Sequence, residues 1–263
     1  MDLGIRGKVA VVTAASSGLG KASAMELAAE GAHVAINARN EDALQNAADE
    51  IRSATGAEIL TIAGDVTSEA DIHELLSKTK TRLGSLDILV TNAGGPPAGF
   101  FDDFNAEHYR QAVELNLIST INLCRGAVPH MREQGWGRIV AITSIAAKQP
   151  VENLILSNTA RAGVLGFMKT LSQQIATHGI TVNTLCPGYH LTERLRTLGS
   201  HIAKSEGISV EDVYGRWAAS TPMNRIGDPR EFAAVLAFLC SQRASYLTGA
   251  VIQVDGGAYR ALF

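Results

Sequence analysis

The chain has little cysteine and no histidine cluster. Its three cysteines, Cys124, Cys186 and Cys240, lie far apart without a Cys-x-x-Cys spacing. This pattern indicates small, buried apolar residues in a reducing compartment rather than a redox site. The seven histidines are scattered without the spacing of metal ligands, so the sequence predicts no metal site.

Long apolar runs and an excess of positive charge are also absent. No apolar run reaches the roughly 18 residues of a membrane span. The N-terminal segment carries Asp2, Arg6 and Lys8 and leads directly into a strand pattern, so we expect no signal peptide and a cytoplasmic protein. The net charge is -3 and no basic cluster occurs, which argues against nucleic acid or membrane as a partner. A small-molecule substrate is the better expectation.

Composition and periodicity predict a single α/β domain over residues 1–263. Hydrophobic residues make up 46% of the chain and charged residues 19%, enough to bury a sizeable core. Short apolar runs alternate with longer amphipathic stretches, as in a Rossmann-type, doubly wound parallel sheet with helices on both faces. The predicted strands are Val9–Thr13, Val34–Ala38, Ile59–Ala63, Ile88–Thr91, Arg138–Thr143, Thr181–Cys186 and Val251–Val254, with helices near 18–30, 41–54, 68–83, 106–131, 153–177 and 229–240.

The segment 187–228 has the least regular pattern. It opens with Pro187-Gly188 and closes with the turn Gly227-Asp228-Pro229. An insertion after the sixth strand lies at the carboxyl edge of the sheet, where open α/β sheets bind ligands. We expect a mobile lid over the substrate, with a purely structural excursion as the alternative.

A glycine-containing turn joins the first strand to the first helix. It reads Thr13-Ala14-Ala15-Ser16-Ser17-Gly18-Leu19-Gly20. Glycines there let the backbone approach a pyrophosphate, and the helix N-terminus presents free N–H groups to the anion. Ala14 stands where such a turn favours glycine, so the turn is either displaced or keeps an ordinary φ at that residue. The position between a strand and a helix, in the first βαβ unit, predicts a dinucleotide site.

The end of the second strand indicates which dinucleotide binds. It reads Asn37-Ala38-Arg39-Asn40, about 20 residues after the turn. An acidic residue there would accept hydrogen bonds from the ribose 2′-hydroxyl and repel a 2′-phosphate. The acid is absent, and the planar guanidinium of Arg39 suits a phosphate. We therefore predict NADP(H) in preference to NAD(H), the alternative being a solvent-facing arginine.

With these residues considered, the chain resembles the short-chain dehydrogenases/reductases, particularly the 3-oxoacyl-acyl-carrier-protein reductases, from about Lys8 to Gly257. The resemblance implies roles for several motifs. Thr13 to Gly20 is similar to the cofactor turn, and Asp65-Val66 to the adenine contact. Thr91-Asn92-Ala93-Gly94 resembles an Asn-Asn-Ala-Gly segment beside the cofactor. Pro187-Gly188, with Thr192 beyond, resembles the nicotinamide-contacting loop. Asn116 and Ser144 match the helix-four asparagine and the catalytic serine, and the C-terminal matches are Leu247-Thr248-Gly249 and Val254-Asp255-Gly256-Gly257.

The resemblance breaks at the Tyr-x-x-x-Lys pair of the helix after strand five. Counting from Ser144, the matching positions are Ser157 and Arg161. The i, i+4 spacing keeps both on one helix face. A serine hydroxyl is a much weaker acid than a phenol of pKa near 10, and it reaches less far. Arg161 can bind ribose hydroxyls or offset negative charge, but it cannot exchange protons.

Three other residues are candidates for the missing proton donor. Lys148 lies four residues beyond Ser144, in a loop that could overhang the nicotinamide. Tyr189 and His190 follow Pro187-Gly188 directly, and the ordinary pKa of histidine suits proton transfer near neutrality. Solvated loop positions are the alternative for all three.

Two functions remain open from the sequence. The first is an NADP(H)-dependent oxidoreductase that moves a hydride between the nicotinamide and a carbonyl or alcohol, with Asn116 and Ser144 orienting substrate or water and Arg161 holding the ribose. The second is an NADP(H)-binding protein with little turnover, acting as a sensor or an inactive oligomer partner. The resemblance also implies a homotetramer, or a homodimer, through the helices near 106–131 and 153–177.

Overall fold

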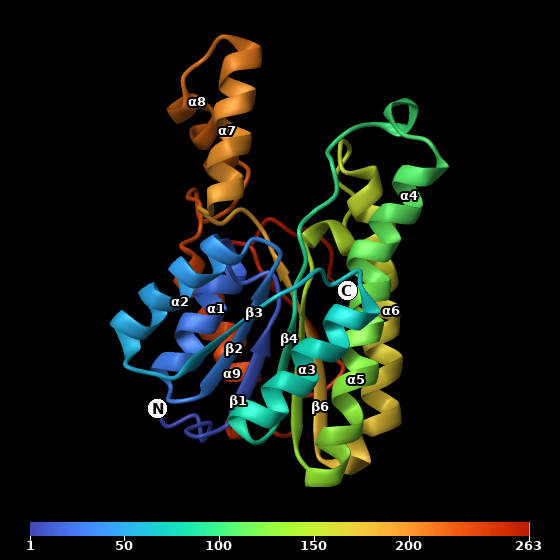
Figure 1. The fold of residues 1–263 in the computed structure, drawn as a ribbon. Helices are drawn as coiled ribbons and strands as arrows, with labels where there is room; N and C mark the ends of the chain where they lie inside the picture. Colours follow the sequence, from blue (N-terminus) through green and yellow to red (C-terminus); the bar gives the residue numbers. More distant parts are fainter. Residues whose placement is uncertain (263) are drawn as a thin grey trace.

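A seven-stranded parallel sheet forms the centre of the computed structural model, which describes residues 1–262 (Figure 1). Its strand order is β3-β2-β1-β4-β5-β6-β7. Each predicted strand is present, and its ends agree with the prediction to within one residue. The strands are β1 (Val9–Val12), β2 (His33–Ala38), β3 (Ile59–Ala63), β4 (Ile88–Thr91), β5 (Gly137–Ile142), β6 (Ile180–Pro187) and β7 (Val251–Val254).

Alternate side chains of β1 supply two separate cores. Ala10 and Val12 pack into one cluster with residues of α1 (Gly18–Ala29), α2 (Glu41–Thr55) and α9 (Pro229–Leu239). Val11 packs into the other, with α3 (Glu69–Leu83), α5 (Ser119–Gln134) and α6 (Ile155–Ile175). Because both faces of the strand are covered, its sequence is continuously apolar rather than alternating. The predicted fold class is confirmed.

The helices begin and end where their capping residues stand. The Ser68 side chain accepts a hydrogen bond from the Asp71 amide at the start of α3, and Gly84 ends that helix in the left-handed conformation, with φ +88°. Such caps satisfy backbone groups that a helix end leaves unpaired. Helix α2 is capped in the same way, by Asn40 at its start and Gly56 at its end. Local sequence therefore determines these boundaries.

The predicted helix near 106–131 is not continuous. Helix α4 (Ala106–Val113) passes into a π-helical segment, η2 (Glu114–Ile118), before α5 begins. Such π-helical turns inside α-helices are rare and are frequently found at functional sites. Here it holds Asn116, which is 4% exposed.

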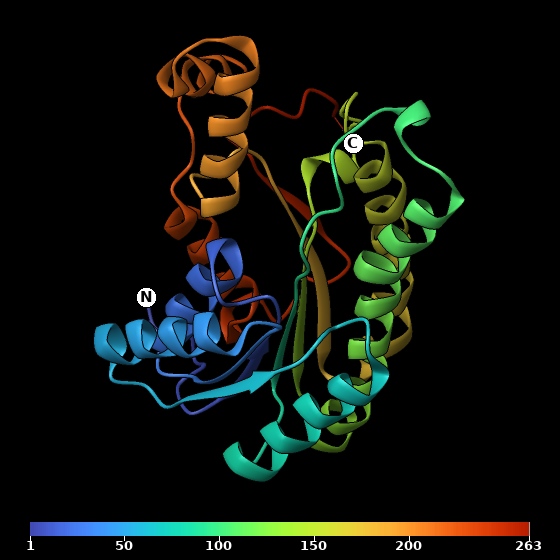
Figure 2. The same cartoon turned by 45° about the horizontal axis from the view of Figure 1, so that its top comes forward.

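The segment predicted to be irregular contains two helices. They are α7 (Glu193–Glu206) and α8 (Val210–Ala219), which rise together above the sheet (Figures 1 and 2). Each helix has only a short amphipathic pattern. The two helices pack on each other, with Tyr214 and Trp217 of α8 against Gly199 of α7. Two glycines in this segment have structural roles: Gly207, with φ +68°, ends α7, and Gly199 allows the close contact with α8.

All three cysteines are buried with free thiols, as expected. Within residues 1–262, none of the helices combines the length and the apolar character that a bilayer crossing requires.

Replacing Gly20 by alanine tests the packing of α1 against the first turn. An added Cβ would overlap the Ala14 carbonyl oxygen and approach the Asn92 Nδ2 to 2.9 Å. Such overpacking costs about 1–3 kcal/mol, so we expect Gly20→Ala to lower the free energy of unfolding by that amount in urea denaturation. The matched control is Gly166→Ala in α6, where a Cβ meets nothing within 4 Å. That variant should be neutral or slightly stabilised, and equal effects of the two would contradict the packing argument.

Candidate functional site

A cleft of about 640 Å³ opens at the carboxyl ends of the strands. This volume lies in the range of ligand-binding pockets, and the cleft spans the point between β1 and β4 where the strand order reverses. It is lined by most of the residues predicted to bind the cofactor: Ala14, Ser16, Ser17, Gly18, Leu19, Arg39, Asn40, Asp65, Val66, Asn92, Ala93, Gly94, Pro187, Gly188 and Thr192.

The first turn leaves the N-terminus of α1 open to this cleft. Ser17 precedes the helix, but its side chain makes no capping hydrogen bond, and the first turn of the helix carries no acidic residue. Gly18 adopts φ +57°, a conformation that glycine takes without strain. The free amides and the positive end of the helix dipole therefore face the cleft, as a phosphate group requires.

Ala14 takes the left-handed conformation, with φ +48°. Of the two alternatives predicted for this position, a displaced turn or an ordinary φ, the ordinary φ is wrong. The left-handed conformation costs about 1–2 kcal/mol for the alanine Cβ.

Thr13 and Gly20 lie behind the turn and do not line the cleft. The Thr13 hydroxyl donates to the Asn92 carbonyl at 2.7 Å and accepts from the Asn92 amide at 2.9 Å. The Asn92 side chain in turn donates to the Ala14 carbonyl at 3.3 Å. These bonds tie the end of β4 to the turn after β1 and hold the strained Ala14 in place.

The β2–β3 end of the cleft carries one exposed cation. The Arg39 side chain is 80% exposed, and its Nη1 lies 3.8 Å from the Asp65 carboxylate. An exposed pair at this distance contributes little, so the guanidinium is available to a ligand. Asn40 caps α2 by accepting from the Ala43 amide at 2.7 Å, and the Asp65 carboxylate accepts from the Thr67 amide at 2.9 Å.

The opposite part of the cleft, which we call the β5 end, is lined by Ser144, Ser157 and Arg161. The Ser144 Oγ accepts from the Ala146 amide at 3.1 Å. Ser157 is 6% exposed, and among the described residues its hydroxyl has no hydrogen-bond partner. Arg161 is 8% exposed, and its Nη1 donates to the Thr143 carbonyl at 2.9 Å. Burial lowers the pKa of Arg161 to about 10, and the nearby charge of Arg194 lowers it too. Arg161 therefore stays charged at neutral pH.

Asn116 does not line the cleft. It lies in η2, which packs against α6, the helix of Ser157 and Arg161. Its Nδ2 donates to the Ala112 carbonyl at 3.2 Å, and within residues 1–262 its buried Oδ1 has no partner. Asn116 is thus placed behind the β5 end.

The structure separates the three candidate proton donors. Lys148 lies outside the cleft, with its ammonium 4.4 Å from the centre of the Tyr259 ring. Tyr189 is also outside, stacked on Trp217 with ring centres 5.4 Å apart, and burial raises its pKa. His190 does line the cleft, but it is 5% exposed and its Nδ1 lies 3.3 Å from the Gly188 carbonyl. Burial lowers the pKa of His190, so the neutral ring prevails near neutrality.

Thr192 brings the segment after β6 close to the first turn. Its hydroxyl caps α7 by accepting from the Leu195 amide at 3.3 Å. A Cβ built on Gly18 would lie 3.5 Å from the Thr192 methyl group. The two loops therefore face each other across the cleft.

Sequence reasoning missed Arg194, which lines the cleft from the first turn of α7. Its Nη1 donates to the Gly95 carbonyl at 3.1 Å and its Nη2 to the Pro96 carbonyl at 3.3 Å. A cation in the first turn of a helix faces the positive end of the dipole, which costs roughly 0.3–1 kcal/mol. Because the sequence pattern predicted no helix after Thr192, the placement of Arg194 could be recognised only once the start of α7 was known.

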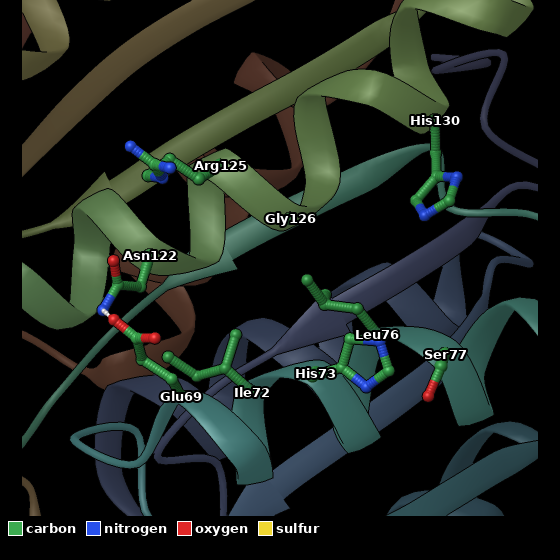
Figure 3. Close-up of a pocket in the computed structure, with 9 residues that line it drawn as sticks. All are labelled: Glu69, Ile72, His73, Leu76, Ser77, Asn122, Arg125, Gly126 and His130. Atoms are coloured by element: carbon green, nitrogen blue, oxygen red, sulfur yellow. Dashed lines mark hydrogen bonds between the residues drawn. The ribbon is translucent and has the colours of Figure 1, made fainter.

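A second cavity, of about 480 Å³, lies between α3 and α5 (Figure 3). Glu69 and Asn122 approach each other across it, with 3.4 Å between the Asn122 Nδ2 and a carboxylate oxygen. None of the predicted site residues lines this cavity. The candidate site is therefore the cleft at the carboxyl edge.

Comparisons with known proteins agree with this geometry. Residues 13–259 match the family described as enoyl-(acyl carrier protein) reductase. The solved structure of L-sorbose reductase from Gluconobacter frateurii, complexed with NADPH and L-sorbose, has a TM-score of 0.96 to this chain at 35% identity, covering 100% of both chains.

Two curated proteins are similar over nearly their whole length. The NADPH-dependent reductase BacG of Bacillus subtilis is 32% identical over 256 residues, which are 97% of this chain and 99% of that protein. The 3-oxoacyl-[acyl-carrier-protein] reductase FabG of Escherichia coli is 34% identical over 257 residues, 98% of this chain and 99% of that protein. The chain belongs to this reductase family, within the short-chain dehydrogenases/reductases.

Replacing Ala14 by glycine measures the strain in the first turn. Relief of the left-handed alanine is worth about 1–2 kcal/mol, while the added freedom of the unfolded chain costs about 0.4–1 kcal/mol. We therefore expect Ala14→Gly to raise the free energy of unfolding by about 0.5–1 kcal/mol in urea denaturation. The control is Ala162→Gly at an exposed position of α6, which should lose about 1 kcal/mol. A loss at Ala14 as large as at Ala162 would show that the turn is unstrained.

Proposed function

We propose that this chain is an NADP(H)-dependent oxidoreductase that moves a hydride between the nicotinamide and a carbonyl or alcohol carbon, through an active site with Ser157 and Arg161 in place of the tyrosine and lysine of its family. The observation that carries the proposal is the single cleft in which the uncapped N-terminus of α1, Arg39 and the pair on α6 meet. Relatives whose names include NADPH share the whole fold.

The residues present fit a dinucleotide with a 2′-phosphate. The open amides of Ser17 to Leu19 suit the pyrophosphate. At the other end of the cleft, Arg39 offers a planar, exposed guanidinium. The Asp65 carboxylate lies 3.8 Å from its Nη1. Asp65 and Val66 line the cleft beside Arg39 and suit the adenine. This set favours NADP(H) over NAD(H).

The bound nicotinamide supplies or accepts the hydride. In the reductive direction the carbonyl oxygen gains negative charge as its carbon receives the hydride, and this oxygen must then take a proton. Arg161, a buried cation tethered to the Thr143 carbonyl, is placed to stabilise that charge where water is scarce. The Ser157 and Ser144 hydroxyls can orient the carbonyl or a water that delivers the proton. Asn116 supports the site indirectly, because its π-helical segment packs against α6.

His190 remains the one candidate donor among Lys148, Tyr189 and His190 whose position borders the cleft. Its neutral ring can donate through one nitrogen only, and its Nδ1 is engaged by the Gly188 carbonyl. We therefore favour water, held by Ser157, as the immediate proton source.

The second candidate function is NADP(H) binding with little turnover. It is favoured by the free Ser157 hydroxyl, a weak acid that nothing in the described residues activates. General acid catalysis supplies roughly 10²–10⁴-fold in rate, and its loss could leave a binding protein. In either function we propose a homotetramer or homodimer through α5 and α6, with 187–228 as a lid.

The cofactor preference is tested by exchanging the charge at Arg39. We expect NADPH to bind the unaltered protein at least tenfold more tightly than NADH in fluorescence titrations. Arg39→Asp should reverse this preference, because a carboxylate repels the 2′-phosphate and accepts from the ribose hydroxyls. Arg230→Asp, at an exposed position outside the cleft, is the control and should change neither affinity. Tighter binding of NADH by the unaltered protein, or an unchanged preference in Arg39→Asp, contradicts the proposal.

Turnover is tested by NADPH oxidation with a panel of ketones, quinones and 3-oxoacyl thioesters. We expect slow reduction of at least one carbonyl class, with a further rise of roughly 10²-fold or more in Ser157→Tyr/Arg161→Lys, because the pair restores a general acid. Tight NADPH binding without oxidation across the panel would instead establish the binding function.

A further inference from the structure

The charges that line the cleft are unevenly distributed. Its charged side chains are Arg39, Asp65, Arg161 and Arg194, together with the titratable His190. The one carboxylate, Asp65, lies beside Arg39 at the β2–β3 end. The rest of the cleft therefore has two guanidinium groups, that of Arg161 at the β5 end and that of Arg194 on α7, and, among the described residues that line the cleft, no carboxylate to balance them.

Arg161 has donors that the protein does not use. Both of its hydrogen bonds leave from Nη1, to the carbonyls of Thr143 and Ile142. Within residues 1–262, Nε and Nη2 have no partner, although the side chain is 92% removed from solvent and borders the cleft. A buried guanidinium with open donors is costly unless a ligand pairs with it.

Arg194 lines the same cleft from α7. Its hydrogen bonds to the Gly95 and Pro96 carbonyls carry it across to the loop after β4. Burial is the main cause that lowers the pKa of Arg161, and the charge of Arg194 lowers it further. Arg161 is buried and Arg194 is exposed, and an anion that binds both would offset their like charges.

In the proposed function the cofactor's phosphates are placed elsewhere in the cleft, the pyrophosphate at the open amides of α1 and the 2′-phosphate at Arg39. The ribose hydroxyls that Arg161 can also bind are neutral and leave its charge unbalanced. An anionic partner for the two arginines would then come with the substrate. We infer that Arg161 and Arg194 form a subsite for an anionic group, a carboxylate or a phosphate, on the carbonyl or alcohol substrate. This inference rests on the proposed function for the identity of the reacting group.

The guanidinium fork suits either anion, because both present paired oxygens. Binding of the anionic group would hold the carbonyl near Ser157 and Ser144 at the same end of the cleft. In such a site, positioning by charge would compensate in part for the absence of a strong acid. Neutral ketones lack this anchor and would bind poorly.

The test compares each anionic ligand with a neutral partner of the same carbon skeleton. The carboxylate arm pairs 2-oxo and 3-oxo acids of four to eight carbons with their methyl esters, and the phosphate arm pairs dihydroxyacetone phosphate with dihydroxyacetone. Each is titrated calorimetrically into the protein with and without saturating NADP⁺. We expect at least one acid or phosphate to bind at least tenfold more tightly than its neutral partner. The arm in which this occurs identifies the anion.

Variants identify the residues. Arg194→Met should remove most of that tenfold preference while changing the NADPH affinity less than threefold. Arg196→Met, which like Arg194 is exposed on α7 but lies outside the cleft, is the matched control and should keep the preference. Arg161→Met should also lose it, and Arg161→Lys, which keeps the charge and guards against misfolding, should retain part of it.

The outcomes separate this inference from the proposed function. A charged ligand that binds with preference but is never reduced supports the subsite and contradicts turnover. Equal binding of charged and neutral partners overturns the subsite, whether or not any of them is reduced. A loss of NADPH affinity in Arg194→Met as large as the loss of anion affinity also overturns it, because the arginine would then serve the cofactor.

Discussion

The strand order of the sheet is the constraint on which the rest of the site depends. Strand β1 pairs with β2 on one side and β4 on the other, with Val11 opposite both Ala35 and Leu89. Right-handed crossovers run outward from β1 to β2 and β3, and α3 then returns the chain to β4, from which the later strands extend in the opposite direction. This reversal places α1 and α2 on one face and α3 and α5 on the other. The loops diverge at the carboxyl ends, and the space between them is the cleft. The Thr13–Asn92 hydrogen bonds close the bottom of that space.

Positive groups line the cleft from several elements: the open amides of α1, Arg39 after β2, Arg161 on α6 and Arg194 on α7. A buried cation is stabilised only by a partner. The free donors of Arg161 therefore indicate a ligand more directly than its exposed fraction does. The cost of the left-handed Ala14 and of a cation in the first turn of α7 points the same way, since strain and misplaced charge concentrate at functional positions.

Ser157 and Arg161 lie one helical turn apart on α6, and both line the cleft. A serine hydroxyl and a guanidinium offer hydrogen bonds and charge without an easily released proton. Arg161 is anchored by the Thr143 carbonyl, and Asn116 lies in a π-helical segment that packs against α6. Catalysis through such a site would rest on orientation and on stabilising charge at the substrate oxygen.

The sequence by itself determined the sheet, its strand ends and the first turn, because these follow from local periodicity and from residues adjacent in the chain. The position of Arg39 after β2 likewise follows from counting along one βαβ unit. Only the tertiary structure decided that Lys148 and Tyr189 lie outside the cleft, since short loops can point either way from a strand end. It also decided that Ala14 is left-handed, that 187–228 is helical, and that Arg194 meets the loop of Gly95 and Pro96. Those results depend on long-range packing and hydrogen bonds between segments about 100 residues apart, which no local pattern encodes.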